Sequence, residues 1–222
     1  MKKIIWILIL VIVVGKVNAQ QFIDNAVIEF EVKTNIKKTM SNNSWADMIK
    51  ENLPQFKTGY FNFSFNGNKS VYKFDHWDEK AKVPEFMRMN DEQNMYFFDH
   101  DANKIFQQKS IFGSVVSIED SIPAIKWRLT NESRMIAGFN CRKATGKISD
   151  SVYVFAFYTD EIMIPGGPCS INGLPGMIMG LTIPRMYISF IATKVMLNTV
   201  KIADLKPSPA KKPLTRAGLS AM

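Results

Sequence analysis

The chain has 222 residues, 46% of them hydrophobic, two cysteines and a formal net charge of +8, and this length suits about one domain behind a short leader. Three positive charges lie in residues 1–19 and four in residues 206–222, and neither segment contains an acid, so residues 20–205 carry only +1. A nearly neutral body without a basic stripe excludes a nucleic-acid-binding protein.

Residues 1–19 have the pattern of a secretory signal peptide. Two lysines precede an apolar run from residue 4 to 14, and Ala19 is a small residue before an expected cleavage at Gln20. The run is too short to span a membrane comfortably, and no later stretch is long and apolar enough to do so. We therefore expect export across the inner membrane, a location in the periplasm or at the outer membrane or cell surface, and no transmembrane segment after cleavage.

The first elements of the expected domain are a strand and a helix. Residues 27–33 alternate apolar and polar side chains, which is the period of a half-buried strand. A helix is predicted from Ser44, a suitable N-cap, to the residue before Pro54. Its apolar positions share one helical face at Trp45, Met48, Ile49 and Leu53. We expect this amphipathic helix to pack on one face of a sheet.

The remaining elements are predicted to be strands. Residues 60–65 and 70–74 flank Asn66-Gly67-Asn68, a strong hairpin signal. Further strands are predicted at 95–98, 104–108, 115–118, 124–129, 152–159, 187–192 and 196–202. The Pro-, Lys- and Ser-rich residues 206–222 have no apolar pattern and predict a flexible basic tail.

A glycine- and proline-rich block at residues 166–181 is the most distinctive part of the sequence. Leu174-Pro175-Gly176 predicts a four-residue turn with Pro175 in the second position and Gly176 in the third. The apolar run from Met177 predicts a buried strand after this turn. We interpret the block as a folding device, in which Gly173 and Gly176 permit the turn while Leu174 and Met177 anchor it in the core. A binding loop is the alternative.

This block resembles the signature of the GLPGLI family of exported proteins from Bacteroidota. The family sequence Gly-Leu-Pro-Gly-Leu-Ile corresponds here to Gly173, Leu174, Pro175, Gly176, Met177 and Ile178. Residues 134–144, with an apolar run, Gly, Phe and Cys before Lys-Ala, resemble a second family segment. The resemblance implies a single β-rich domain at residues 20–205, without an established biochemical activity. It also implies a companion role beside TonB-dependent transporters.

The predicted fold class is mainly β (α+β). We expect a curved antiparallel sheet or half-barrel with one amphipathic helix packed on it. This arrangement is similar to the LolA-type lipoprotein carriers, in which the sheet holds a helix in its concavity.

Four residues are candidates for chemistry. Cys141 and Cys169 form a disulfide in an oxidising compartment or remain free thiols, and the sequence leaves both options open. The resemblance implies a cysteine at position 141, whereas Cys169 is unusual for the family. His76 and His100, each flanked by aspartates, are weak candidates for a metal site, and a strand exit at His76 and a polar hairpin loop at His100 are the favoured explanation.

No residue forms a recognisable catalytic motif, so we expect a protein that is not an enzyme and uses no cofactor. The first hypothesis is an envelope protein that binds an apolar ligand, a lipid or peptide, in the concavity of its sheet. Its basis is the high phenylalanine and methionine content, 16 and 13 residues. The alternative is an accessory protein of a TonB-dependent outer-membrane transporter or another envelope complex. A metal-binding protein is the second alternative.

Overall fold

The computed structural model describes residues 22–40, 44–80, 82–111, 114–207 and 213–215. The strands are β1 (Asn25–Asn35), β2 (Phe56–Asn66), β3 (Lys69–Trp77), β4 (Met95–Asp99), β5 (Lys104–Ile111), β6 (Ser114–Ser121), β7 (Lys126–Ile136), β8 (Phe139–Ser149), β9 (Val152–Thr159), β10 (Met177–Ile183) and β11 (Ile188–Leu197). The helices are α2 (Ile36–Thr39), α3 (Ser44–Lys50) and α4 (Met89–Gln93), with single 3-10 turns η1 (Glu85–Met87), η2 (Pro184–Met186) and η3 (Ile202–Asp204).

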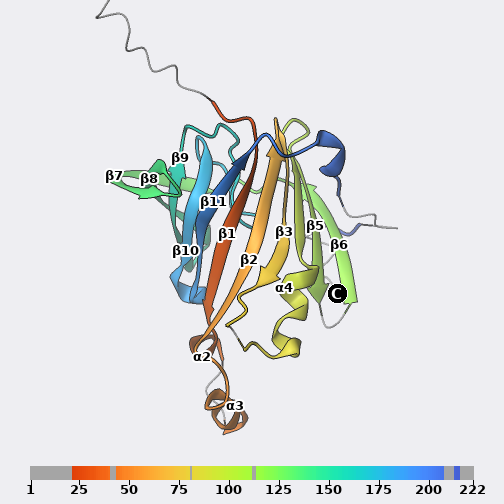
Figure 1. Cartoon of the computed structure of the whole chain (residues 1–222), viewed down its shortest axis with the longest axis vertical. Coiled ribbons are helices and arrows are strands. Elements are labelled where there is room, and N and C mark those ends of the chain that lie inside the picture. Colours follow the sequence, from red (N-terminus) through yellow and green to blue (C-terminus); the bar gives the residue numbers. More distant parts are fainter. Residues whose placement is uncertain (1–21, 41–43, 81, 112–113, 208–212, 216–222) are drawn as a thin grey trace, which may run out of the picture.

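All eleven strands belong to one curved sheet in the order β6-β5-β4-β3-β2-β1-β11-β10-β9-β8-β7, and the paired neighbours are antiparallel (Figure 1). Each half of the sheet is a meander of consecutive strands, and the two halves meet where β1 pairs with β11. The predicted mainly β half-barrel is therefore confirmed. Because β6 and β7 are its two edges, the link at residues 122–125 connects one edge to the other.

The alternation seen in the sequence places one side of each strand in the main core. Ala26, Ile28, Phe30 and Val32 are buried on β1, and their partners on β2 include Phe61, Phe63 and Phe65. One hydrophobic cluster joins side chains from β5 near one edge to those from β8 near the other. This face of the sheet is thus the concave one, since side chains from opposite ends of the sheet meet on it.

The opposite face carries a smaller apolar cluster that the C-terminal segment covers. Val71 and Phe97 pack there with Val200 and Leu205. The side-chain amide (Nδ2) of Asn25 donates a hydrogen bond to the Val200 carbonyl oxygen at 2.9 Å and fixes this segment. The strand predicted at 196–202 is therefore wrong. β11 ends at Leu197, and the chain then crosses the convex face instead of pairing again.

Part of the predicted flexible tail is attached to the sheet. Leu214 forms a parallel bridge with Ile118 on β6. Its amide donates to the Ser117 carbonyl oxygen at 2.8 Å, and its carbonyl oxygen accepts from the Glu119 amide at 2.9 Å. Residues 213–215 of the predicted tail therefore lie against the β6 edge.

The predicted helix is present as α3 but lies below the end of the sheet, beyond α2 (Figure 1). Met48, expected on its packed face, is 77% exposed, whereas Leu53 after the helix is buried. The helix that packs beside the sheet is α4, next to β3 and β5. Asp91 of α4 accepts a hydrogen bond from the Lys57 ammonium group at 2.5 Å. The sequence therefore predicts a helix correctly and its packing incorrectly.

The predicted signal peptide and its cleavage site lie outside the described residues. Among the residues that the structure describes, none of the helices has the length and apolar character needed to cross a bilayer.

Candidate functional site

The glycine-rich signature follows β9 and runs into the start of β10, at the concave face. Gly173 and Gly176 have φ angles of +88° and +134°, and Leu174 and Met177 are buried, as predicted. The turn itself is tighter than predicted. The Gly176 amide donates to the Leu174 carbonyl oxygen at 2.8 Å, so the turn spans three residues with Pro175 in the centre.

Gly176 is required by close packing as well as by its backbone angle. A Cβ atom at this position would overlap the backbone carbonyl group of Thr159, the last residue of β9. The next residue, Met177, donates its amide to the Ile162 carbonyl oxygen at 3.0 Å. The turn is therefore held against the end of β9, and only glycine fits there.

Residues 160–176 occupy the concavity in which the apolar ligand was expected. Ile162, Ile164, Ile171 and Leu174 belong to the main hydrophobic cluster. A Cβ atom at Gly166 would lie 2.5 Å from the ring of Phe63 on β2, which shows how closely the segment rests on the sheet. The chain itself therefore fills the place that a helix holds in the expected LolA-type arrangement.

Trp127 on β7 connects residues 160–176 to the edge of the sheet by a hydrogen bond. Its indole Nε1 donates to the carbonyl oxygen of the buried Asn172 at 2.9 Å. The indole lies over Gly146 of β8, where a Cβ atom would lie 2.8 Å from the ring. Glycine at 146 thus makes room for the tryptophan that connects the edge strand to the glycine-rich segment.

Both cysteines are free thiols, so the disulfide that the sequence allows is not formed in this structure. Cys141 is buried on β8, where burial raises the pKa of its thiol to about 11. Cys169 has a φ of +56° and forms a hydrogen bond with the Tyr96 side chain, and burial raises the pKa of its thiol to about 12. The two sulfur atoms therefore have different surroundings and low reactivity.

We expect both thiols to resist alkylation in the folded protein at pH 8. The thiolate is the reactive form, and this pH lies well below their raised pKa values of about 11 and about 12. Unfolding in urea returns the pKa values to about 8.5, and both cysteines then react with iodoacetamide. Mass spectrometry counts the added groups. An unfolded chain that reacts only after a reductant is added would contradict the free thiols, because it would contain the disulfide.

The two histidines do not share a site. His100 directly follows Asp99, which pairs with Lys69 at the start of β3. His76 lies near the other end of the same strand, roughly 23 Å away at the rise of an extended chain. Within the described residues, no group of three His, Cys, Asp or Glu side chains is placed to hold a metal ion. The geometry therefore excludes one metal ion bound by both histidines.

Each histidine instead stacks on an aromatic ring. His76 lies 4.6 Å from the Tyr60 ring centroid, and its Nδ1 is 2.7 Å from the Asp75 carboxylate. His100 stacks on Phe98 at 5.6 Å, and its Nε2 atom is buried without a hydrogen-bond partner. Burial lowers the pKa of His100, although Asp101 and Asp99 oppose this shift. Its ring is thus neutral at pH 7.

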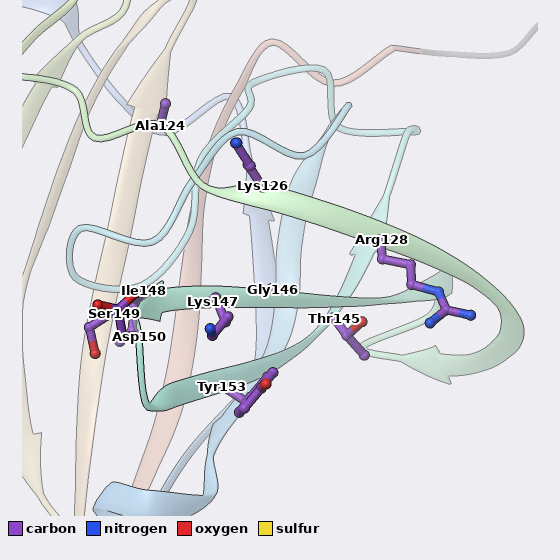
Figure 2. A pocket seen from close by; sticks show the side chains of 10 residues that line it. All are labelled: Ala124, Lys126, Arg128, Thr145, Gly146, Lys147, Ile148, Ser149, Asp150 and Tyr153. Carbon is purple, nitrogen blue, oxygen red and sulfur yellow. The ribbon is translucent and has the colours of Figure 1, made fainter.

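A surface groove of about 540 Å³ lies over β7, β8 and β9, on the side away from the core (Figure 2). Pairing between these strands aligns the side chains in rows. Lys126 on β7 faces Lys147 on β8, and Lys147 faces Tyr153 on β9. In the next row Arg128 faces Thr145. Three strands thus contribute to one cationic and aromatic surface.

The groove carries an excess of positive charge. Its cations are Lys126, Arg128 and Lys147, and Asp150 is the acidic residue among those that line it. The ion pairs formed within the described part of the chain do not involve these three cations. The Lys147 ammonium group lies 5.5 Å from the Tyr153 ring centroid and makes a cation–π contact. The groove therefore suits an anionic group.

Sequence reasoning missed this groove. Its residues are spread from position 124 to 153, and the net charge of the whole domain conceals them. The available signal was the two-residue spacing of Lys126 with Arg128 and of Thr145 with Lys147, which puts each pair on one face of a strand. Only the register of β7 on β8 brings the two pairs together.

Comparisons with known proteins show the fold alone. No family model matches the chain, and no curated protein matches it significantly. PNGF-II in space group P21 is similar, with a TM-score of 0.57 and 14% identity over 90% of this chain and 33% of that one. PNGF-II in space group C2 gives a TM-score of 0.54 and 15% identity over 88% and 32%. An uncharacterized conserved protein from Thermus thermophilus gives 0.43 and 9% over 86% and 90%.

The chain spans about a third of the length of PNGF-II. At such low identities, the similarity indicates a shared strand arrangement and carries no information about residues of the groove.

Proposed function

We propose that the chain is an exported, non-catalytic binding protein of the GLPGLI type. In this proposal it acts in the cell envelope by contacting an acidic partner protein through the β7–β9 groove. The leader-like residues 1–19 and the signature at 173–178 support the envelope role. The positive charge of the groove supports contact with an acidic partner.

The observation that carries this proposal is the pairing of Lys126 on β7 with Lys147 on β8. Like charges directly opposite each other on neighbouring antiparallel strands destabilise the pair. Both lysines are exposed, and Arg128 adds a third positive charge on the same surface. A carboxylate of a bound partner between these cations would remove the repulsion and form charge-assisted hydrogen bonds.

The surroundings of the groove suit a protein partner. Tyr153, which lines the groove, is 56% exposed. Ile148, at the end of β8, is a further exposed apolar side chain that lines it. Exposed aromatic and aliphatic groups next to cations are typical of protein interfaces. This composition favours the accessory role over the binding of a small inorganic anion.

The apolar-ligand hypothesis receives less support from the geometry. A lipid or peptide in the concavity would have to displace residues 160–176, which bury Ile162, Ile171 and Leu174 against the sheet. Such a displacement would also break the hydrogen bond between Trp127 and Asn172. Contact through the open groove requires neither change.

Reversing both lysines of the row tests the proposal. We expect Lys126→Glu/Lys147→Glu to bind a fluorescent glutamate-rich peptide roughly tenfold more weakly than the parent, because two exposed ion pairs contribute about 1–2 kcal/mol together. Fluorescence anisotropy at low and high salt measures the affinity. Crosslinking in the native envelope should recover an acidic protein with the parent and lose it with the variant.

The matched control is Lys73→Glu/Lys194→Glu, which makes the same change in net charge on the exposed surfaces of β3 and β11. It should bind the peptide nearly as tightly as the parent. An equal loss of peptide affinity in both double variants would show that binding depends only on net charge and would contradict a site on β7–β9.

A further inference from the structure

The β6 strand is an edge of the sheet that is partly occupied by the chain's own tail. On one side β6 pairs with β5 over its whole length. On the other side Leu214 bridges to Ile118, with hydrogen bonds to the backbone of Ser117 and Glu119. An edge strand presents unpaired backbone donors and acceptors to any extended chain. Residues 213–215 satisfy only a small part of them.

The groove beside the β6 edge is larger than the tail segment 213–215 that lies in it. A groove of about 520 Å³ remains beside Pro213, Leu214 and Thr215. Its other walls are the turn at 102–104 and the residues Glu119–Ser121. Leu214 itself makes two backbone hydrogen bonds and one bridge to β6, so a longer strand paired along Ser114–Ser121 would form more backbone bonds than this residue does.

The edge and the tail have complementary charges. Acidic side chains near this end of β4, β5 and β6 are Asp99, Asp101, Glu119 and Asp120, and the neighbouring cations are Lys69 and Lys104. Residues 206–222 contain four basic residues and no acid. Leu214 is the apolar residue at the edge, and the sequence on both sides of it is basic, so an apolar residue flanked by basic residues would match the charge of this edge.

We propose that the β6 edge is a strand-acceptor site for an extended basic segment of a partner protein, and that residues 213–215 hold this site as an exchangeable occupant. Addition of a strand to an exposed sheet edge is a common mode of peptide recognition, in which backbone hydrogen bonds supply affinity and side-chain pockets supply specificity. A second copy of the chain is a poor candidate for the partner. Its tail would form only the short pairing that each chain already makes with its own β6, and the intramolecular tail has the advantage of a high effective concentration. The site lies at the opposite edge of the sheet from β7 and is independent of the groove described above.

The test releases the tail in the full exported chain by Leu214→Pro, which removes the amide that donates to Ser117. The probe is a fluorescent synthetic peptide with the sequence of residues 206–222. We expect it to bind the variant about 100-fold more tightly than the parent, in which the resident tail competes intramolecularly. Leu214→Ala keeps the amide and should behave as the parent does. A peptide that carries the same proline substitution should not bind.

Hydrogen exchange at the Glu119 amide reports on release of the tail independently. This amide donates to the Leu214 carbonyl oxygen, so it should be protected in the parent and in Leu214→Ala and should exchange rapidly in Leu214→Pro. Retained protection in Leu214→Pro, failure of the peptide to bind that variant, or equal binding of the proline-substituted peptide would each overturn the proposal. Self-association of Leu214→Pro without peptide binding would also overturn it and would assign the edge to a second copy.

Discussion

Gly176→Val is expected to abolish the soluble folded protein. The side chain would have to adopt a φ of +134° and would overlap the Thr159 carbonyl group at the end of β9. A β-branched residue resists positive φ, and the backbone contact leaves no flexible neighbour that could move aside. Soluble yield and the melting temperature measure the effect.

The matched control is Gly173→Ala three residues earlier. Gly173 also has a positive φ, +88°, but a Cβ atom there would meet only Trp127 Nε1, at 3.8 Å. Backbone strain alone then costs about 1–2 kcal/mol, so this variant should fold with a moderately lower melting temperature. A normal melting temperature for Gly176→Val would instead indicate that the glycine serves a binding loop.

Leu174→Ala is expected to lower the free energy of unfolding by about 3 kcal/mol, because it leaves a cavity where a fully buried leucine packs. For a domain of this size, the melting temperature should fall by roughly 10 °C. Urea unfolding monitored by tryptophan fluorescence gives the free energy. Leu129→Ala is the control, since Leu129 is 52% exposed, and it should change stability by no more than about 0.5 kcal/mol.

Similar small decreases in the free energy of unfolding for Leu174→Ala and Leu129→Ala would contradict the anchoring role assigned to Leu174 in the signature. In that case Leu174 would not anchor residues 160–176 in the concavity, and an apolar ligand would have room beside the sheet. The experiment therefore also separates the contact proposal from the apolar-ligand hypothesis.

Local pattern in the sequence was enough to predict the class of fold and several of its parts. Alternation marked the buried side of β1 and β2, and Asn66-Gly67 marked the hairpin that joins β2 to β3. The burial of Leu174 followed from the same reasoning, because a large apolar residue between glycines has few other uses. These features depend on residues close together in the chain, where steric and hydrophobic preferences act directly.

The sequence by itself thus determined a β-rich chain with tight turns and a glycine-dependent bend. Only the tertiary structure decided that β1 pairs with β11 and that the chain fills its own concavity. It placed His100, which follows β4, near the opposite end of β3 from His76. It also decided that Lys126 faces Lys147 and that Leu214 joins β6. The physical reason is that pairing between distant strands depends on complementary surfaces formed only when the whole sheet assembles, and spacing along the chain does not report them.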